Sequence, residues 1–252
     1  MPRGRNLIRA LAAGLRRRRR RVREQVLSTL TPVALERLRQ DPATLRPTYE
    51  ACAAELRADL GPRFAYLTPR EREFAFCTVV AHSLAGWGAE STCVTFPDLL
   101  REPCLNCGNY GLLVHHLAGV LRADVAETAR LRVVGWDGPA MGNHQMLFLD
   151  RPEGGRSLLL DPTLGLIADT DFDTVAAGRP VPAGRLVKFR VRGGIEGFEA
   201  LIVGALLGGR VRPSELLYYF DGFDHLLLRY GHARDWPTPG ACAWRARAGV
   251  NS

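Results

Sequence analysis

Lysine is almost absent from this chain of 252 residues, since Lys188 is the only lysine among 34 basic residues. We interpret this preference for arginine as the compositional habit of a GC-rich bacterial genome. Long apolar runs are also lacking. The longest one after the N-terminal region, residues 201–207, is far shorter than the about 20 residues that a membrane-spanning helix needs. The sequence therefore predicts a globular chain that is long enough to bury a sizeable core.

Cysteine is sparse and unevenly spaced, at positions 52, 77, 93, 104, 107 and 242. This spacing does not resemble the disulfide framework of a small secreted protein. Residues 7–15 are apolar but are interrupted by Arg9 and followed by six arginines. A signal peptide has its charges before an unbroken apolar run, which is the reverse order. We therefore expect a cytoplasmic protein.

Positive charge is concentrated at the N-terminus. Residues 1–23 carry ten arginines and no acidic residue, which leaves 24 basic against 26 acidic residues in the rest of the chain. The basic character thus belongs to an arm, residues 1–24, and says nothing about a substrate of the body. Two interpretations of the arm stay open: an anchor to an anionic membrane surface or a nucleic acid, and a solvated tail.

The hydrophobic periodicity predicts one α+β domain over residues 25–252, with helical segments at both ends and a core at about residues 90–192. Pro32 after Thr31 and Pro69 after Thr68 are typical of capped helix starts. The predicted helices are 26–39 (with a fresh start at Pro32), 48–59, 69–85, 107 to about 123, 195–207 and 214–230. The predicted strands are 130–136, 144–149, 157–161 and 185–192, with a turn at 137–139, a hairpin loop at 151–156 and an irregular end at 235–252.

Cys107 lies where a loop becomes a helix. Asn106 is a suitable N-cap, and apolar residues recur at helical spacing after it, namely Leu112, Leu113, Leu117, Val120 and Leu121. The first-turn N–H groups and the helix dipole favour a thiolate at this position, and they also favour a developing oxyanion. Cys107 is therefore a candidate nucleophile.

A histidine and an aspartate complete the candidate site. His144 is predicted to open one strand after a bend at 142–143, and Asp161 closes the next, in an extended conformation because Pro162 follows. If these strands pair antiparallel through the loop at 151–156, the two side chains become neighbours. A carboxylate on one imidazole nitrogen fixes the tautomer, so that the other nitrogen can serve the thiol.

The stretches 107–113 (Cys-Gly-Asn-Tyr-Gly-Leu-Leu), 143–145 (Asn-His-Gln) and 160–165 (Leu-Asp-Pro-Thr-Leu-Gly) resemble the transglutaminase-like cysteine enzyme family. The resemblance covers roughly residues 100–167. It implies a papain-related α+β core, in which a nucleophile helix packs on an antiparallel sheet, with Cys107 as nucleophile, His144 as base and Asp161 as orienting carboxylate. It also implies a cysteine-dependent amide hydrolase or acyltransferase acting through a thioester on a peptide or protein-like substrate, with no cofactor. One oxyanion donor, the Cys107 N–H, is recognisable, and the second is not.

Other interpretations of the same residues stay open. The fold can serve as a binding module without turnover, and Cys104 with Cys107 forms a C-x-x-C pair that suggests zinc or redox chemistry, with Cys93, His115 or His116 as further zinc ligands. Cys104 can also regulate Cys107 by oxidation. Tyr110 and Trp136 are candidates to line a substrate cleft. Asp169, Asp171 and Asp173 favour a solvated turn or helix cap over a calcium site.

Overall fold

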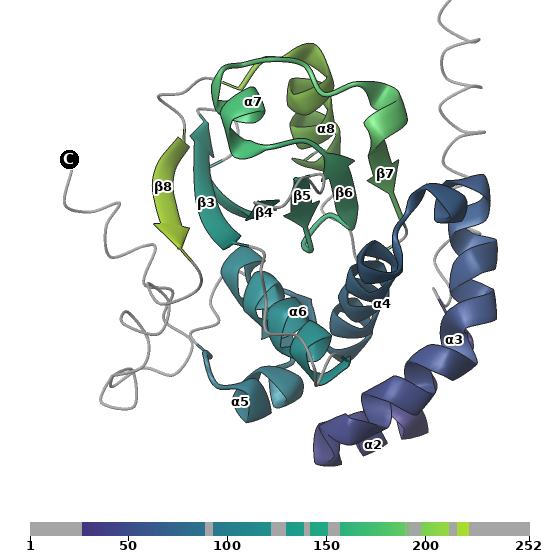
Figure 1. Cartoon of the computed structure of the whole chain (residues 1–252). Coiled ribbons are helices and arrows are strands. Elements are labelled where there is room, and N and C mark those ends of the chain that lie inside the picture. Colours follow the sequence, from purple (N-terminus) through teal and green to yellow (C-terminus); the bar gives the residue numbers. More distant parts are fainter. Residues whose placement is uncertain are drawn as a thin grey trace, which may run out of the picture.

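The computed structural model describes residues 27–88, 93–121, 130–138, 142–150, 157–189, 191, 198–211 and 216–221. The basic arm at 1–24, the loop at 151–156 and the C-terminal stretch 235–252 lie outside the described residues. Within the described residues the chain is mixed α+β, as predicted, with helices on both sides of an antiparallel sheet (Figure 1).

The described helices are α2 (Pro32–Gln40), α3 (Leu45–Leu60), α4 (Pro69–Leu84), α5 (Phe96–Arg101), α6 (Cys107–Leu121), α7 (Phe172–Ala176) and α8 (Phe198–Gly208). Three 3₁₀ turns, η1 (Pro42–Thr44), η2 (Gly61–Tyr66) and η3 (Ala183–Arg185), connect elements. Both predicted caps are confirmed, because Thr31 accepts from the backbone of Ala34, and Thr68 forms a reciprocal capping box with Glu71.

The main sheet has the order β7-β6-β5-β4-β3-β8, and all of its neighbouring strands run antiparallel. Its strands are β3 (Arg130–Gly138), β4 (Gly142–Asp150), β5 (Leu158–Asp161), β6 (Leu166–Asp169), β7 (Leu186–Lys188) and β8 (Leu216–Asp221). A separate two-stranded parallel pair, β1 (Gly86–Trp87) and β2 (Cys104–Leu105), precedes α6.

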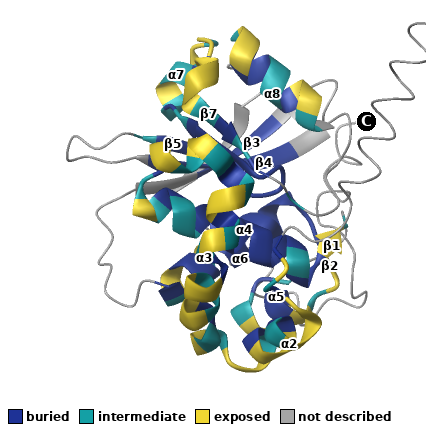
Figure 2. Ribbon diagram, turned by 90° about the vertical axis from the view of Figure 1, so that its right-hand side faces the viewer, coloured by how far each residue is buried: buried dark blue, intermediate teal, exposed yellow. Residues whose placement is uncertain are grey.

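The sheet separates two apolar layers. Alternate side chains of its strands, such as Leu147 and Leu160, belong to one cluster of buried residues together with those of α4 and α6. The side chains between them, such as Phe148 and Leu159, join the residues of α7 and α8 on the other face. Figure 2 shows α4 and α6 as mostly buried ribbons, while α2, α3 and α5 carry exposed residues. The sheet is therefore buried on both faces, and α6 is a core helix.

Several predicted elements are corrected by the structure. Residues 216–221 form strand β8 against β3 rather than part of a helix at 214–230, because a Leu-Leu-Tyr-Tyr-Phe run also suits a strand that has a partner. The strand β3 continues to Gly138, so residues 137 and 138 belong to no turn, and β4 begins at Gly142 rather than at His144. The strand predicted at 185–192 is limited to β7.

Four short elements are missing from the prediction. Helix α5 is a single capped turn and a half that starts after Thr95, β1 and β2 are two residues each, and β6 has only four. Elements this short carry too few residues for a periodic pattern, and their partners define them. Of the three acidic residues, Asp169 ends β6 and Asp173 lies in the first turn of α7. Asp171 caps α7 by accepting the Thr174 N–H, as the cap alternative predicts.

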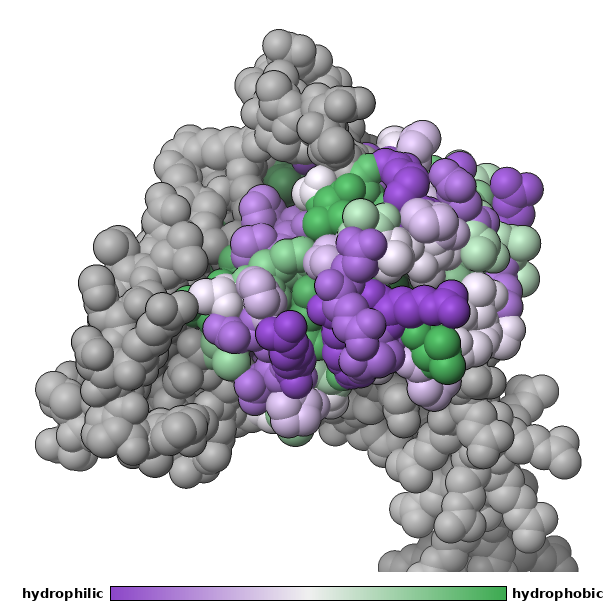
Figure 3. Space-filling view, turned by 90° about the horizontal axis from the view of Figure 1, so that it is seen from below, coloured by the Kyte–Doolittle hydropathy of each residue, from purple (hydrophilic) through white to green (hydrophobic). Residues whose placement is uncertain are grey.

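The surface beneath the helical layer is mixed in character. Seen from below, strongly hydrophilic side chains gather near the middle of the described face, with hydrophobic patches beside them (Figure 3). None of the helices in the described part of the chain has the length and apolar character to cross a bilayer.

Candidate active site

The start of α6 carries Cys107. Asn106 precedes it, and the Asn106 Oδ1 accepts a hydrogen bond from the Asn109 N–H at 2.9 Å, which confirms the predicted N-cap. The Asn106 backbone oxygen accepts the Tyr110 N–H at 2.9 Å. Cys107 keeps 6% of its surface exposed, and Leu113 and Leu117 farther along the helix are fully buried. The apolar helix face thus anchors the cysteine at the edge of the core.

His144 and Asp161 meet as predicted. The His144 Nε2 lies 2.7 Å from the Asp161 Oδ2, and each residue is only 1% exposed. The strand register Leu147 to Leu160 brings the end of β5 beside the first half of β4. The second carboxylate oxygen, Asp161 Oδ1, accepts the Leu164 N–H at 3.1 Å. Both oxygens are therefore held, one by the imidazole and one by the turn that begins at Pro162.

The imidazole also reaches the cysteine. Since a carboxylate only accepts hydrogen bonds, the His144 Nε2 carries a proton toward Asp161, which leaves Nδ1 for its hydrogen bond with the Cys107 side chain. Burial alone lowers the pKa of His144, but the Asp161 charge, its hydrogen bond and the contact with Cys107 outweigh burial and raise this pKa to about 10. The three residues form one buried array, in which the imidazole lies between the Asp161 carboxyl group and the Cys107 side chain.

Gln145 also lies at the site, although its place after His144 is the only feature of the sequence that points to it. It is 2% exposed, and its Oε1 lies 2.5 Å from the position that a Cβ on Gly108 would occupy. A side chain at position 108 would require this amide to move. Gly108 therefore lets β4 approach the first turn of α6 closely, so that His144 reaches Cys107.

His82 comes from α4 and lies beside the array. Its Nε2 is 2.9 Å from the Pro162 carbonyl oxygen, and its ring stacks on that of Tyr110 with 4.3 Å between centroids. The Tyr110 hydroxyl donates to the Ala85 carbonyl oxygen at 2.9 Å, and burial raises the pKa of Tyr110 well above its ordinary value. Sequence periodicity gives no signal for these contacts, because they join residues from three separate elements.

The two residues predicted to line a cleft are both buried. Tyr110 has no exposed surface, and its ring and hydroxyl are occupied by His82 and Ala85. Trp136 is 2% exposed and lies directly opposite His144 in the β3–β4 register. Trp136 is thus a neighbour of His144, whereas Tyr110 packs against His82.

The other cysteines and histidines are spread around the site. Cys104 is exposed on β2, the Cys93 thiol donates to Glu102 Oε2 at 3.1 Å, and the His116 ring stacks on Phe96. Among the residues that the structure describes, no three histidine, cysteine or acidic side chains are placed to share a metal ion. The geometry thus gives no support to a zinc site built on Cys104 and Cys107.

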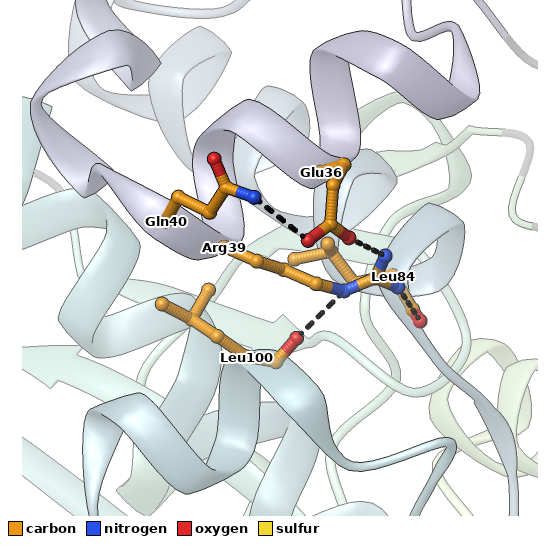
Figure 4. A network of polar contacts seen from close by, with 5 residues as sticks. All are labelled: Glu36, Arg39, Gln40, Leu84 and Leu100. Carbon is orange, nitrogen blue, oxygen red and sulfur yellow. Dashed lines mark hydrogen bonds and ion pairs between the residues drawn. The ribbon is translucent and has the colours of Figure 1, made fainter.

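A second polar cluster is formed by residues of α2, α4 and α5 (Figure 4). The Arg39 guanidinium donates to the carbonyl oxygens of Leu84 and Leu100, each at 3.0 Å, and pairs with Glu36 at 3.3 Å. A depression lined by Glu36, Arg39, Gln40 and Arg101 lies here. Because Arg39 already serves the ends of two helices, this cluster is a structural clamp.

The chain was compared with protein-family models, with curated proteins and with solved structures, and none of them matches it.

Proposed function

We propose that this protein is a cysteine-dependent amide hydrolase or acyltransferase with a papain-related, transglutaminase-like core. One observation carries the proposal: a buried His144–Asp161 pair at 2.7 Å whose imidazole also bonds the Cys107 side chain at the start of a core helix. A nucleophile, a base and a residue that orients the base are the parts that acyl transfer needs.

The proposed reaction starts from a Cys107 thiolate beside a protonated His144. The Sγ attacks the carbonyl carbon of an amide, and the carbonyl oxygen becomes an oxyanion near the Cys107 N–H. As the C–N bond breaks, the imidazolium gives its Nδ1 proton to the leaving amine, and a thioester remains on Sγ. The high pKa of His144 suits this step, because the imidazole must be protonated when the amine departs.

The second half returns the enzyme to its starting state. Water or an amine attacks the thioester carbonyl, gives a proton to His144 and displaces the Cys107 thiolate as the C–S bond breaks. Asp161 keeps the imidazole oriented in both halves through its Oδ2. Hydrolysis and acyl transfer use the same residues, so the acceptor that reaches the thioester decides between them.

The first experiment measures iodoacetamide alkylation of Cys107 against pH by peptide mass spectrometry. Trypsin cleavage after Arg101 and Arg122 leaves Cys104 and Cys107 on one peptide, so Cys104→Ser is the background. We expect reactivity to persist well below pH 8 in this background and to be lost in His144→Ala. The buried Cys77 serves as an internal control of folding, because its alkylation reports unfolding.

The alternative function, a binding module without turnover, gives a different profile. In that case Cys107 would react only as the pH approaches about 8.5, the ordinary range of a free thiol, and His144→Ala would change nothing. Such a result would overturn the enzymatic proposal. A positive result would be followed by trapping an acyl group on Cys107 with peptide amides and esters.

A further inference from the structure

His82 contacts the turn that follows Asp161 and the helix that carries Cys107. From α4 its imidazole reaches the Pro162 carbonyl oxygen at 2.9 Å, one residue after Asp161. Its ring lies nearly parallel to Tyr110, at an angle of 17°, three residues after Cys107 on α6. The chain of contacts thus runs from the carboxylate through His82 to the nucleophile helix.

An imidazole at this position is costly for packing alone. His82 is 4% exposed, and its neighbours on α4, such as Val79 and Ala81, are apolar and fully buried. A leucine would fill an apolar space without the free-energy cost of desolvating two ring nitrogens. The hydrogen bond offsets this cost, since Nε2–H donates to a carbonyl that can only accept.

The acceptor of this bond, the Pro162 carbonyl oxygen, belongs to the turn that follows Asp161. Pro162 has no N–H, so the turn after Asp161 has one backbone donor fewer to hold it. Within the turn, the Leu164 N–H bonds to Asp161, and Phe189 N–H bonds to Gly165 O at 3.0 Å. The bond from His82 holds the turn from the helical side.

The partner on the other side is equally fixed. The Tyr110 hydroxyl donates to Ala85 O, at the end of α4, so the Tyr110 ring cannot shift without losing that bond. His82 therefore lies between a turn and a ring that are each anchored. The distance between Asp161 and the first turn of α6 is determined through it.

We infer that His82 is a positioning residue that holds the Asp161 turn and the Cys107 helix in register, so that His144 meets both partners. This inference rests on the proposed function for its catalytic consequence. Misplacement of reacting groups by about 1 Å can slow a reaction by about 10²-fold, which makes such a positioning contact valuable. His82 itself takes no proton in the proposed reaction.

The test separates the hydrogen bond from the packing. His82→Phe keeps a ring against Tyr110 and removes the donor, His82→Gln keeps an N–H donor and removes the ring, and His82→Met is a second donor-free variant should phenylalanine prevent folding. Thr78→Val is the matched control, since Thr78 lies one turn earlier on α4, is 3% exposed and donates its hydroxyl hydrogen bond to Phe74 O of its own helix. All are made in the Cys104→Ser background.

Two readouts are measured on each folded variant. NMR titration of the His144 ring follows its pKa, and alkylation of Cys107 follows thiolate reactivity. In the donor-free variants we expect the His144 pKa to fall, because the Asp161 carboxylate moves away from the imidazole. We expect alkylation at about pH 6 to slow about tenfold, which corresponds to the loss of one hydrogen bond. His82→Gln should recover most of both signals, and Thr78→Val should leave both unchanged.

The outcomes keep the two proposals distinct. An unchanged His144 pKa in folded His82→Phe or His82→Met would overturn the positioning role, whatever the reactivity of the thiol. A parent protein without reactive thiolate at low pH would overturn the enzymatic proposal, while the NMR titration would still decide the role of His82.

Discussion

Asp161 is the residue whose environment is most specific. It is 1% exposed, one oxygen accepts from His144 and the other from the Leu164 N–H. A buried carboxylate is stable only with such partners. Its role is thus twofold, because it orients the imidazole and it closes the turn that follows β5.

We predict that Asp161→Asn lowers the free energy of unfolding by about 3 kcal/mol near pH 7, since it leaves a buried imidazolium without its counter-charge. Urea denaturation measures this loss. The raised pKa of His144 sets the pH window: protonation of His144 stabilises the fold fully below about pH 6.5, and this contribution is lost as the pH rises through about 10. The difference between wild type and variant should therefore shrink over that interval.

Asp171→Asn is the control for this prediction, because Asn also caps a helix and Asp171 lies at the start of α7. Its effect should stay within about 0.5 kcal/mol at every pH. An Asp161→Asn loss that is no larger than the control would contradict the paired state of His144.

At the scale of elements, the start of α6 places the N-cap Asn106 next to the candidate nucleophile Cys107. Asn106 is 5% exposed, and its side chain accepts the Asn109 N–H while remaining neutral. An aspartate would cap the helix equally well but would bring a negative charge beside Cys107, where the proposed reaction needs a thiolate.

We predict that Asn106→Asp keeps the thermal stability of the protein and slows Cys107 alkylation at about pH 6 by about tenfold, because like charges disfavour each other in a buried site. Asn106→Ala should instead lower the free energy of unfolding by about 1 kcal/mol, because the cap is missing, and should not slow the alkylation. Equal alkylation rates in wild type and Asn106→Asp would contradict a thiolate at this position.

A second arrangement of elements depends on Arg39. This side chain of α2 donates to Leu84 O at the end of α4 and to Leu100 O near the end of α5, where helix carbonyls have no intrahelical partner (Figure 4). It thereby fixes α2 against the ends of two helices, one of which carries His82.

We predict that Arg39→Ala lowers the free energy of unfolding by about 2 kcal/mol, since two carbonyls lose a charged donor. Arg37→Ala, an exposed neighbour on the same helix, should change it by less than about 0.5 kcal/mol. Chemical denaturation of both variants measures the difference, and equal losses would rule out the clamp.

At the scale of the whole molecule, two histidines respond to pH in opposite ways. Protonation of His144 stabilises the fold, because the pKa of His144 is raised to about 10. Burial, followed by the charge of His115, lowers the pKa of His116 to about 4. The His116 ring stacks on Phe96 of α5, and its Nε2 is buried with no hydrogen-bond partner among the described residues. The contact between α5 and α6 therefore requires a neutral His116.

We predict that His116 makes the fold sensitive to acid. The unfolded chain binds a proton at this site below about pH 6.5 and the folded chain only near pH 4, so stability falls as the pH decreases over that interval. His116→Phe keeps the stack and should reduce this loss in thermal scans from pH 7 to pH 4. His115→Gln, at an exposed position, removes only the smaller contribution of the His115 charge, so it should keep most of the wild-type loss.

Local chemistry allowed much of this protein to be predicted from its sequence. Thr31 with Pro32, Thr68 with Pro69, and Asn106 before Cys107 predict helix starts, because a cap depends only on neighbouring residues. The contact between His144 and Asp161 is also predictable, because Asp161 ends the strand that pairs antiparallel with β4. Strand pairing through a short connection leaves few possible registers.

Contacts between distant elements were decided only by the tertiary structure. Residues 216–221 became a strand because β3 offered an unpaired edge, and Tyr110 became a packing residue because His82 and Ala85 lie against it. Gln145 lies against Gly108 of α6, and His82 bonds to the Pro162 carbonyl oxygen, so both contacts depend on residues of other elements. The sequence by itself determined the caps, the alternation and the three candidate catalytic residues, since these depend on near neighbours. The fold decided what surrounds those residues, because burial and hydrogen-bond partners exist only after packing.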